Sequence, residues 1–361
     1  MGLTYSQQNY DKDRYTQPYL ASQPADAAAG KAIAITGATG NGLGLKFAKL
    51  AASLGASKII LLNRPSERSR KALADLAEAV PAGCTVTHVD CDLNSLDAVK
   101  AAAPALAAQC DGKLDVLMLN SGIMASPDET TEDGYNREIQ VNVIAQLLLL
   151  KLAMPLLEAA AAARGEARFC FQSSGARLGS TPIIDAAFDK VPPQGLPEEL
   201  RGDKGGGMMS AGPAWKRYHQ TKLANSLSMM ILHEKLQEKG SKVKALCCAP
   251  GLAATDLQAT TNKTGNMKAW ETNLIFMLLG QSSNDGALPM THACLMPGVE
   301  SGSLVEPSGG LIGAYGLPIC VSSNGKFLPK WVKQEKNTIS NPEAKASFWS
   351  KIEAACGGPV V

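Results

Sequence analysis

The chain has 361 residues, of which 45% are hydrophobic and 19% are charged, and 35 basic against 33 acidic residues leave a formal net charge of +2. This balance is typical of a soluble globular protein whose core needs no disulfides or structural metal. The charges are mixed along the chain and no basic patch with interleaved aromatic residues occurs, so we expect no nucleic-acid partner.

The nine cysteines of the chain indicate a reducing compartment. Their number is odd and no C-x-x-C spacing occurs, which argues against a disulfide framework and against a zinc site. Most lie in apolar runs, where a free cysteine packs as a small hydrophobic side chain. We therefore expect a protein of the cytoplasm or of another reducing compartment, an organelle included, that is not secreted and binds no metal.

The segment 1–30 is predicted to be a flexible leader, because it is polar and lacks the apolar core of a signal peptide. Gly2 followed by Ser6 fits the loose pattern for myristoylation, but so short a motif often arises by chance, and an ordinary N-terminus is the favoured interpretation. No apolar run is long enough to cross a bilayer, since the longest cover only 147–150 and 274–279.

After the leader, strand-like and helix-like segments alternate. The expected strands are 31–36, 57–63, 84–90, 114–120, 168–174 and 243–249. The expected helices are 41–54, 67–79, 96–108, 135–162 and 214–239. We expect Pro104 to shorten the third helix and Pro155 to bend or divide the fourth.

The strands are continuous apolar runs, as in parallel strands that are covered on both faces. Strand–helix alternation with right-handed crossovers predicts one doubly wound, Rossmann-type α/β domain over 31–330, with a mostly parallel sheet of about seven strands. The residues 331–361 then form a C-terminal extension. Ligands of such a sheet bind at the carboxyl ends of the strands, so the loops there are the candidate site.

The first strand runs into a glycine-rich turn that opens a helix. Glycines let the backbone approach a pyrophosphate, and the helix start supplies N–H donors and the positive end of its dipole. A plain tight turn is the alternative, but the position between strand and helix favours dinucleotide binding. The residues concerned are Thr36, Gly37, Thr39, Gly40, Asn41, Gly42, Leu43 and Gly44.

The ends of the second and third strands concern the adenosine half of the cofactor. The second ends in Asn63-Arg64, with no acidic residue to accept the ribose 2′-hydroxyl of NAD, and Arg64 could face a 2′-phosphate instead. This predicts NADP(H), with a solvated surface arginine as the alternative. Asp92 and Leu93 could border an adenine, although a helix N-cap role for Asp92 or Asn94 is an equal alternative.

Tyr218 and Lys222 are spaced i, i+4 in a helix-like stretch, so their side chains share one face. A nearby ammonium stabilises a phenolate and lowers the tyrosine pKa from about 10, which would make Tyr218 an acid–base near neutral pH. Such a pair alone is common on helix surfaces. Here further candidates stand at strand ends or on flanking helices: Asn120, Ser121, Gly122, Asn142, Ser174, Pro250, Gly251 and Thr255.

With these motifs in this order, residues 31–316 resemble the short-chain dehydrogenase/reductase family. The resemblance implies that Tyr218 is the catalytic acid–base and that Lys222 binds the nicotinamide ribose and lowers the tyrosine pKa. It also implies that Ser174 hydrogen-bonds the substrate oxygen and that Asn142 shapes its helix so that the backbone holds a water of the proton relay. By the same resemblance, the sheet near the cofactor is steadied by Asn120-Ser121-Gly122. The nicotinamide is bordered by Pro250, Gly251 and Thr255.

The chain departs from the family pattern in two places. Four residues separate Gly37 from Gly42, one more than is usual, which leaves open whether Gly40 or Asn41 is accommodated. The gap between Ser174 and Tyr218 is also long. The excess is a Gly- and Pro-rich insert, 176–212, which must loop out and return if the site is to assemble, and which we expect beside the substrate cleft.

Apolar residues in the insert and in 255–284 are candidates for a substrate pocket. They include Met208, Met209 and Phe276. Ordinary core packing, or a helix face against a partner subunit, is an equally good interpretation.

The sequence thus predicts an NADP(H)-dependent oxidoreductase that transfers a hydride between nicotinamide and the alcohol or carbonyl of an apolar small molecule. Three stretches, 132–150, 218–225 and 285–287, are most similar to retinol-dehydrogenase-like and protochlorophyllide-reductase-like members. The alternatives are light-dependent reduction of a protochlorophyllide-type tetrapyrrole and a non-catalytic dinucleotide-binding protein. Contact with a membrane surface and homo-oligomerisation stay open.

Overall fold

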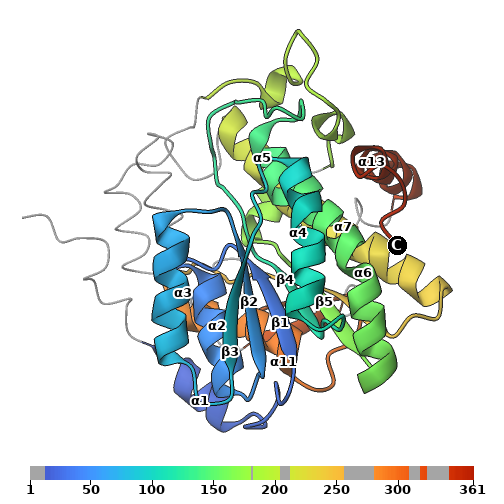
Figure 1. Ribbon diagram of the computed structural model, residues 1–361. Helices are drawn as coiled ribbons and strands as arrows, with labels where there is room; N and C mark the ends of the chain where they lie inside the picture. Colours follow the sequence, from blue (N-terminus) through green and yellow to red (C-terminus); the bar gives the residue numbers. More distant parts are fainter. Residues whose placement is uncertain (1–12, 180–181, 204–211, 256–279, 309–317, 323–340) are drawn as a thin grey trace, which may run out of the picture.

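The computed structural model describes residues 13–179, 182–203, 212–255, 280–308, 318–322 and 341–361, the backbone alone for 318–322. In this part of the chain one sheet runs in the order β3-β2-β1-β4-β5-β6-β7-β8 (Figure 1). Its first seven strands are parallel and β8 is antiparallel to β7. The strands are β1 (Ala32–Thr36), β2 (Lys58–Asn63), β3 (Thr85–Asp90), β4 (Val116–Leu119), β5 (Ala167–Gln172), β6 (Val243–Cys248), β7 (Ser303–Pro307) and β8 (Pro318–Ser322). The predicted doubly wound, mostly parallel sheet is confirmed, and the last two strands are additions to the six located from sequence.

The strand order reverses at β1, which pairs with β2 on one side and β4 on the other. The carboxyl ends of these strands lie level with one another, since Thr36 is in register with Leu62 and Ile35 with Met118. Reversal of the strand order opens a crevice at the carboxyl ends in such folds. The loops after β1, β4, β5 and β6 therefore converge there.

Helices cover both faces of the sheet, as Figure 1 shows for α4, α6 and α7 on one side. Successive side chains of β1 alternate between two apolar clusters, Ala34 facing α4, α6 and α7, and Ile33 and Ile35 facing α2, α3 and α11. The helices are α2 (Leu43–Ser53), α3 (Glu67–Ala79), α4 (Leu96–Gln109), α5 (Arg137–Ile139), α6 (Ala145–Arg164), α7 (Pro213–Glu238) and α11 (Leu288–Leu295). Burial on both sides explains why the strands are continuous apolar runs.

Neither proline shortens or divides its helix, contrary to the expected shortening at Pro104 and division at Pro155. Pro104 lies within α4 and Pro155 within α6, and both are exposed. On the solvent face, water can satisfy the carbonyl that the missing N–H leaves free. The segment Arg137–Arg164, which joins α5, a π-helical turn η2 (Gln140–Ile144) and α6, is long and apolar enough to cross a membrane, contrary to our reading of the sequence. Two thirds of its most apolar window, 67%, is buried inside the protein, as expected of a core helix.

The expected leader is folded over its described residues, contrary to the prediction of flexibility. Helix α1 (Thr16–Ala21) lies against the domain, and Tyr19 is buried. The carboxylate of Asp285, in α10 (Ser283–Gly286), accepts bonds from the backbone N–H groups of residues 14, 15 and 16 and from the Thr16 hydroxyl. At the other end of the chain, α13 (Pro342–Ala355) buries Phe348, Trp349 and Ile352 in the core, so this part of the predicted extension belongs to the domain.

The cysteines whose side chains are described are all free, and all but Cys84 are buried. Among the described residues, no group of three or more His, Cys, Asp or Glu side chains is arranged to hold a metal ion.

Candidate active site

The glycine-rich turn after β1 is locked against the end of β4. The Asn120 side chain donates to the carbonyls of Thr36 and Gly37 at 2.9 and 3.2 Å, and the Thr36 hydroxyl accepts from the backbone N–H groups of Asn120 and Ser121. Gly37 has φ +70°, and a Cβ there would lie 2.4 Å from Ser121 Oγ. A Cβ on Gly44 would lie 2.6 Å from Asn120 Nδ2. Both positions therefore require glycine for this close approach.

The extra residue of this loop is absorbed in a tight turn. The Gly42 N–H donates to the Thr39 carbonyl at 3.1 Å, and Gly40 has φ +55°. The Asn41 side chain turns away and accepts a hydrogen bond from Ser283 at 3.1 Å. Gly42 is the N-cap of α2 and offers no side-chain cap, so the helix start keeps donors for an anionic ligand. The extra residue therefore leaves the start of α2 open to an anionic ligand.

At the end of β2, Asn63 and Arg64 differ in role. Asn63 is buried and its side chain donates to the Ala38 carbonyl, so it supports the glycine turn, whereas Arg64 is exposed and free to meet a ligand. After β3, Asp92 accepts from the backbone and side chain of Asn94, and the buried Leu93 presents its carbonyl to Gln140. The N-cap of α4 is Ser95, so neither Asp92 nor Asn94 has that role.

The structure brings Tyr218, Ser174 and Lys222 together across the end of the sheet. Tyr218 is 5% exposed and its phenol is hydrogen-bonded to the Ser174 side chain. The Lys222 Nζ lies 5.5 Å from the centroid of the Tyr218 ring and donates to the Gln172 carbonyl at 2.9 Å. The insert does not prevent assembly of the site, because Ser174 follows β5, Tyr218 and Lys222 lie in α7, and all three meet at the carboxyl end of the sheet.

Asn142 sits in the π-helical turn η2 and is almost fully buried. Its side chain accepts from the Ile123 N–H at 2.8 Å, donates to the Ile123 carbonyl at 2.9 Å, and donates to the Thr221 hydroxyl at 3.1 Å. Single π-helical turns inside α-helices often occur at functional sites. Asn142 thus joins its helix to the loop after β4 and to the turn of α7 between Tyr218 and Lys222.

The charge environment differs from the sequence prediction, which had Lys222 lower the pKa of Tyr218. Burial and the nearby Glu138 carboxylate raise the tyrosine pKa, and the hydrogen bond with Ser174 opposes them. Burial lowers the pKa of Lys222 to about 8. Desolvation is therefore the largest effect on both groups, and it disfavours the charged form of each.

The remaining candidates flank this centre. A Cβ on Gly122 would lie 3.3 Å from Asn142 Oδ1 and 3.4 Å from Lys222 Nζ, so a side chain there would crowd the site. After β6, Gly251 has φ +70°, the Pro250 carbonyl accepts from Gln281, and Thr255 is buried. Three proposed substrate contacts lie outside the described residues: Met208, Met209 and Phe276.

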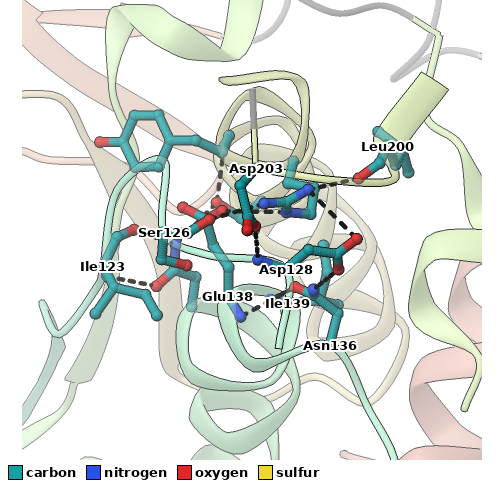
Figure 2. A network of polar contacts seen from close by, with 12 residues as sticks. Ile123, Ser126, Asp128, Asn136, Glu138, Ile139, Leu200 and Asp203 are labelled. Atoms are coloured by element: carbon teal, nitrogen blue, oxygen red, sulfur yellow. Dashed lines mark hydrogen bonds and ion pairs between the residues drawn. The ribbon is translucent and has the colours of Figure 1, made fainter. Parts of the chain in front are cut away.

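The sequence analysis missed two charged residues behind the centre. Glu138 lies one helical turn before Asn142 and Arg217 directly precedes Tyr218, and both side chains are 0% exposed. Their neighbours in the chain could have drawn attention to them, but nothing in the sequence pairs one with the other. Figure 2 shows Glu138 within the polar network that also contains Ser126, Asp128 and Leu200.

Comparison with known proteins agrees with this geometry. The family model for short chain dehydrogenases matches residues 31–177. The oxidoreductase calI of Penicillium decumbens is 33% identical over 150 residues, 42% of this chain and 43% of that relative, so the match spans less than half of its length. Polyprenol dehydrogenase of Mus musculus is 26% identical over 79% of this chain and 76% of its own.

Solved structures share the fold. An uncharacterized protein from Mycobacterium paratuberculosis superposes with a TM-score of 0.65 over 94% of this chain and 98% of its own, at 23% identity. L-sorbose reductase from Gluconobacter frateurii, solved with NADPH and L-sorbose, gives 0.54 over 77% and 95%, at 21% identity. 3-Ketoacyl-(acyl-carrier-protein) reductase from Brucella melitensis, solved with NADH, gives 0.56 over 79% and 99%, also at 21%.

The fold, the glycine turn and the group of Ser174, Tyr218 and Lys222 are similar to those of dinucleotide-binding dehydrogenases. The chain is thus similar to the short-chain dehydrogenases over residues 31–177 and to their fold over most of its length.

Proposed function

We propose that the protein transfers a hydride between NADP(H) and the alcohol or carbonyl carbon of an apolar small molecule, with Tyr218 as the acid–base. The observation that carries this proposal is the hydrogen bond between the Tyr218 phenol and Ser174, with the Lys222 ammonium over the tyrosine ring. When bound, the nicotinamide supplies or accepts the hydride. The protein's own residues orient the reactants and move the proton.

In the reducing direction, Ser174 donates to the substrate oxygen while Tyr218 gives it a proton. Lys222, held by the Gln172 carbonyl, stabilises the phenolate that remains. Asn142 holds Thr221 and the loop after β4 in place, and so fixes the turn of α7 that carries the pair. Oxidation runs the same steps in reverse.

Two features support NADP(H) rather than NAD(H). Arg64 is exposed directly after β2, where a 2′-phosphate would lie, and a guanidinium binds phosphate with two parallel hydrogen bonds. The neighbouring residue, Asn63, is buried against the glycine turn, so no carboxylate stands there to accept a ribose hydroxyl.

Apolar surroundings of Tyr218 support an apolar substrate. Its ring forms a buried cluster with Ala125, Ala214 and Trp215, and the Trp215 and Tyr218 rings meet edge to face with centroids 6.0 Å apart. The polyprenol named for the mouse relative is also a long apolar alcohol. A light-dependent tetrapyrrole reductase stays the second candidate, on the sequence resemblance stated above.

The test is an NADPH-oxidation screen of the purified protein against apolar aldehydes, ketones and quinones, run in darkness and in light, with Tyr218→Phe as the matched variant. We expect turnover of at least one apolar carbonyl in darkness, lost in Tyr218→Phe while NADPH binding, followed by its fluorescence, persists. Turnover by Tyr218→Phe at the wild-type rate would overturn the role of the phenol. Turnover that requires light and protochlorophyllide would establish the second candidate.

A further inference from the structure

Arg217 and Glu138 form a buried ion pair directly behind the proposed catalytic centre. Arg217 Nε lies 3.8 Å from Glu138 Oε2, and both side chains are fully buried. Two unpaired charges could not remain in such a place, because the cost of removing each from water is several kcal/mol. Each residue therefore requires the other.

The remaining nitrogens of Arg217 bind three carbonyls in two separate backbone segments. Nη1 donates to the carbonyls of Leu200 and Gly202 at 2.6 and 2.7 Å, and Nη2 donates to that of Ser126 at 2.7 Å (Figure 2 labels Leu200 and Ser126). Leu200 and Gly202 belong to the insert, and Ser126 belongs to the loop after β4. The guanidinium of Arg217, the residue before Tyr218, thus binds both the insert and the loop after β4.

Glu138 stands at the start of the helix that carries Asn142. The Asn136 side chain caps this helix by accepting from the N–H groups of Glu138 and Ile139. Burial raises the pKa of Glu138 to about 8, although Arg217, the backbone of Ala125 and Ser126, and Lys222 each favour the ionised carboxylate. The pair therefore spans the helices that deliver Asn142 and Tyr218.

Among the described residues, the charged and titratable groups that surround the pair of Glu138 and Arg217 come from two elements. Helix α7 contributes Arg217, Tyr218 and Lys222. The loop after β4 contributes Asp128, whose Oδ2 lies 3.9 Å from Arg217 Nη1 and accepts from the Gly202 N–H. The carboxylate of Glu138 thus acts on both members of the proposed proton-transfer pair.

Resting on the proposed function, we propose that Glu138 and Arg217 are positioning residues, which fix the insert against the catalytic helix and set the electrostatic field around Tyr218 and Lys222. Once Glu138 ionises, its negative charge favours the protonated forms of both groups, and the positive charge of Arg217 partly offsets it. Neither residue touches the reacting atoms. Their removal acts through Tyr218 and Lys222.

The test compares Glu138→Gln, which keeps the shape of the side chain and removes its charge, with Asp115→Asn as the control. Asp115 is a buried carboxylate directly before β4, at the amino end of that strand, where it accepts from the Ala32 N–H. The first readout needs no turnover. Tyrosines labelled with 13C at Cζ are followed by NMR from pH 6 to pH 10, chosen as roughly two units on either side of the pKa values of Glu138 and Lys222, both about 8. The Tyr218 signal is assigned by its loss in Tyr218→Phe.

We expect the wild-type Tyr218 signal to shift with a midpoint near pH 8, since Glu138 and Lys222 both have a pKa of about 8. In Glu138→Gln the midpoint should fall by about one pH unit, because only Lys222 titrates and it has lost a neighbouring negative charge. Asp115→Asn should behave as the wild type. An unchanged titration in Glu138→Gln would overturn the proposal.

The second readout is the pH dependence of kcat/KM for NADPH oxidation with the most active carbonyl of the screen. In Glu138→Gln the fall of kcat/KM at high pH should begin about one pH unit lower than in the wild type, as in the NMR titration. A merely structural role would lower kcat/KM without moving the pH at which it falls. Absence of any wild-type turnover would refute the proposed function, and the NMR titration would still test the coupling. If Glu138→Gln does not fold, Glu138→Asp replaces it, because the shorter side chain keeps the charge but moves it away from Lys222. The midpoint of the Tyr218 titration should then fall by less than in Glu138→Gln, and an unchanged midpoint would count against the proposal.

Discussion

The phenol of Tyr218 is hydrogen-bonded to the side chain of Ser174, although the two residues come from different elements and the insert separates them in the chain. Ser174 follows β5 and is partly exposed, while Tyr218 lies in α7 and is buried. The hydroxyl of Ser174 can therefore face a ligand and the phenol at once. This relationship makes the first prediction specific.

Ser174→Ala should lower kcat by on the order of a hundredfold, because a donor aimed at the substrate oxygen is lost. The neighbouring Ser173→Ala is the matched control, since the Ser173 hydroxyl donates to the Lys222 carbonyl at 2.8 Å rather than to the phenol. Steady-state kinetics with the most active carbonyl compares the two. An equal loss in both variants would show that the loop after β5 is merely sensitive to substitution.

Arg64→Ala should raise the KM for NADPH far more than the KM for NADH, because only NADPH carries the 2′-phosphate that Arg64 would bind. Arg68→Ala, a nearby arginine that is also exposed, is the control. The KM values of both cofactors are measured at one ionic strength, since surface charges are screened by salt. Equal effects on the two cofactors would remove the assignment of NADP(H).

Gly37→Ala should destabilise the fold and abolish dinucleotide binding. The new Cβ would lie 2.4 Å from Ser121 Oγ and 2.9 Å from Ser121 Cα, in addition to the strain of a positive φ, which costs about 1–3 kcal/mol. Gly83→Ala is a matched control, because Gly83 has φ +96° with nothing within 4 Å of the added Cβ. Urea unfolding and NADPH fluorescence separate the clash from the strain. A Gly37→Ala protein as stable as Gly83→Ala would contradict the close packing of this turn.

Asp285→Ala should release the N-terminal segment. The carboxylate of Asp285 accepts four hydrogen bonds from residues 14–16, and alanine has no side-chain acceptor to replace it. Hydrogen exchange should become faster over residues 13–22, while the amides of β1 keep their protection. Asn284→Ala, which removes only a contact with Asp13, is the control. Unchanged exchange in Asp285→Ala would mean that apolar contacts of α1 alone hold the segment.

His219 should make the protein less stable in acid. Burial lowers its pKa from 6.5 in the unfolded chain to about 4, so the unfolded state takes up the proton first as the pH falls. The stability that neutral His219 contributes is present above pH 6.5 and is lost as the pH falls towards 4, by up to about 3 kcal/mol. His219→Gln should lose less stability over this range in urea unfolding. A variant with the same acid loss as the wild type would refute the assignment.

Much of the fold follows from local sequence signals. The apolar runs of β1 and β2, the glycine turn between β1 and α2, and the i, i+4 spacing of Tyr218 and Lys222 depend on residues close together in the chain, so periodicity and composition report them. The two prolines misled the prediction for a physical reason. Whether a proline breaks a helix depends on whether it lies on the solvent-facing side, and tertiary packing decides which side of a helix faces solvent. Pro104 and Pro155 are both exposed.

The sequence by itself determined the alternation of strands and helices, the position of the phosphate-binding turn and the residue types of the proton-transfer group. Only the tertiary structure decided the environment of that group. Burial raises the pKa of Tyr218 where local spacing suggested a lower one, and Glu138 meets Arg217 only because two helices distant in the chain are packed side by side. Desolvation and long-range pairing depend on every element around a residue, and no local pattern carries that information.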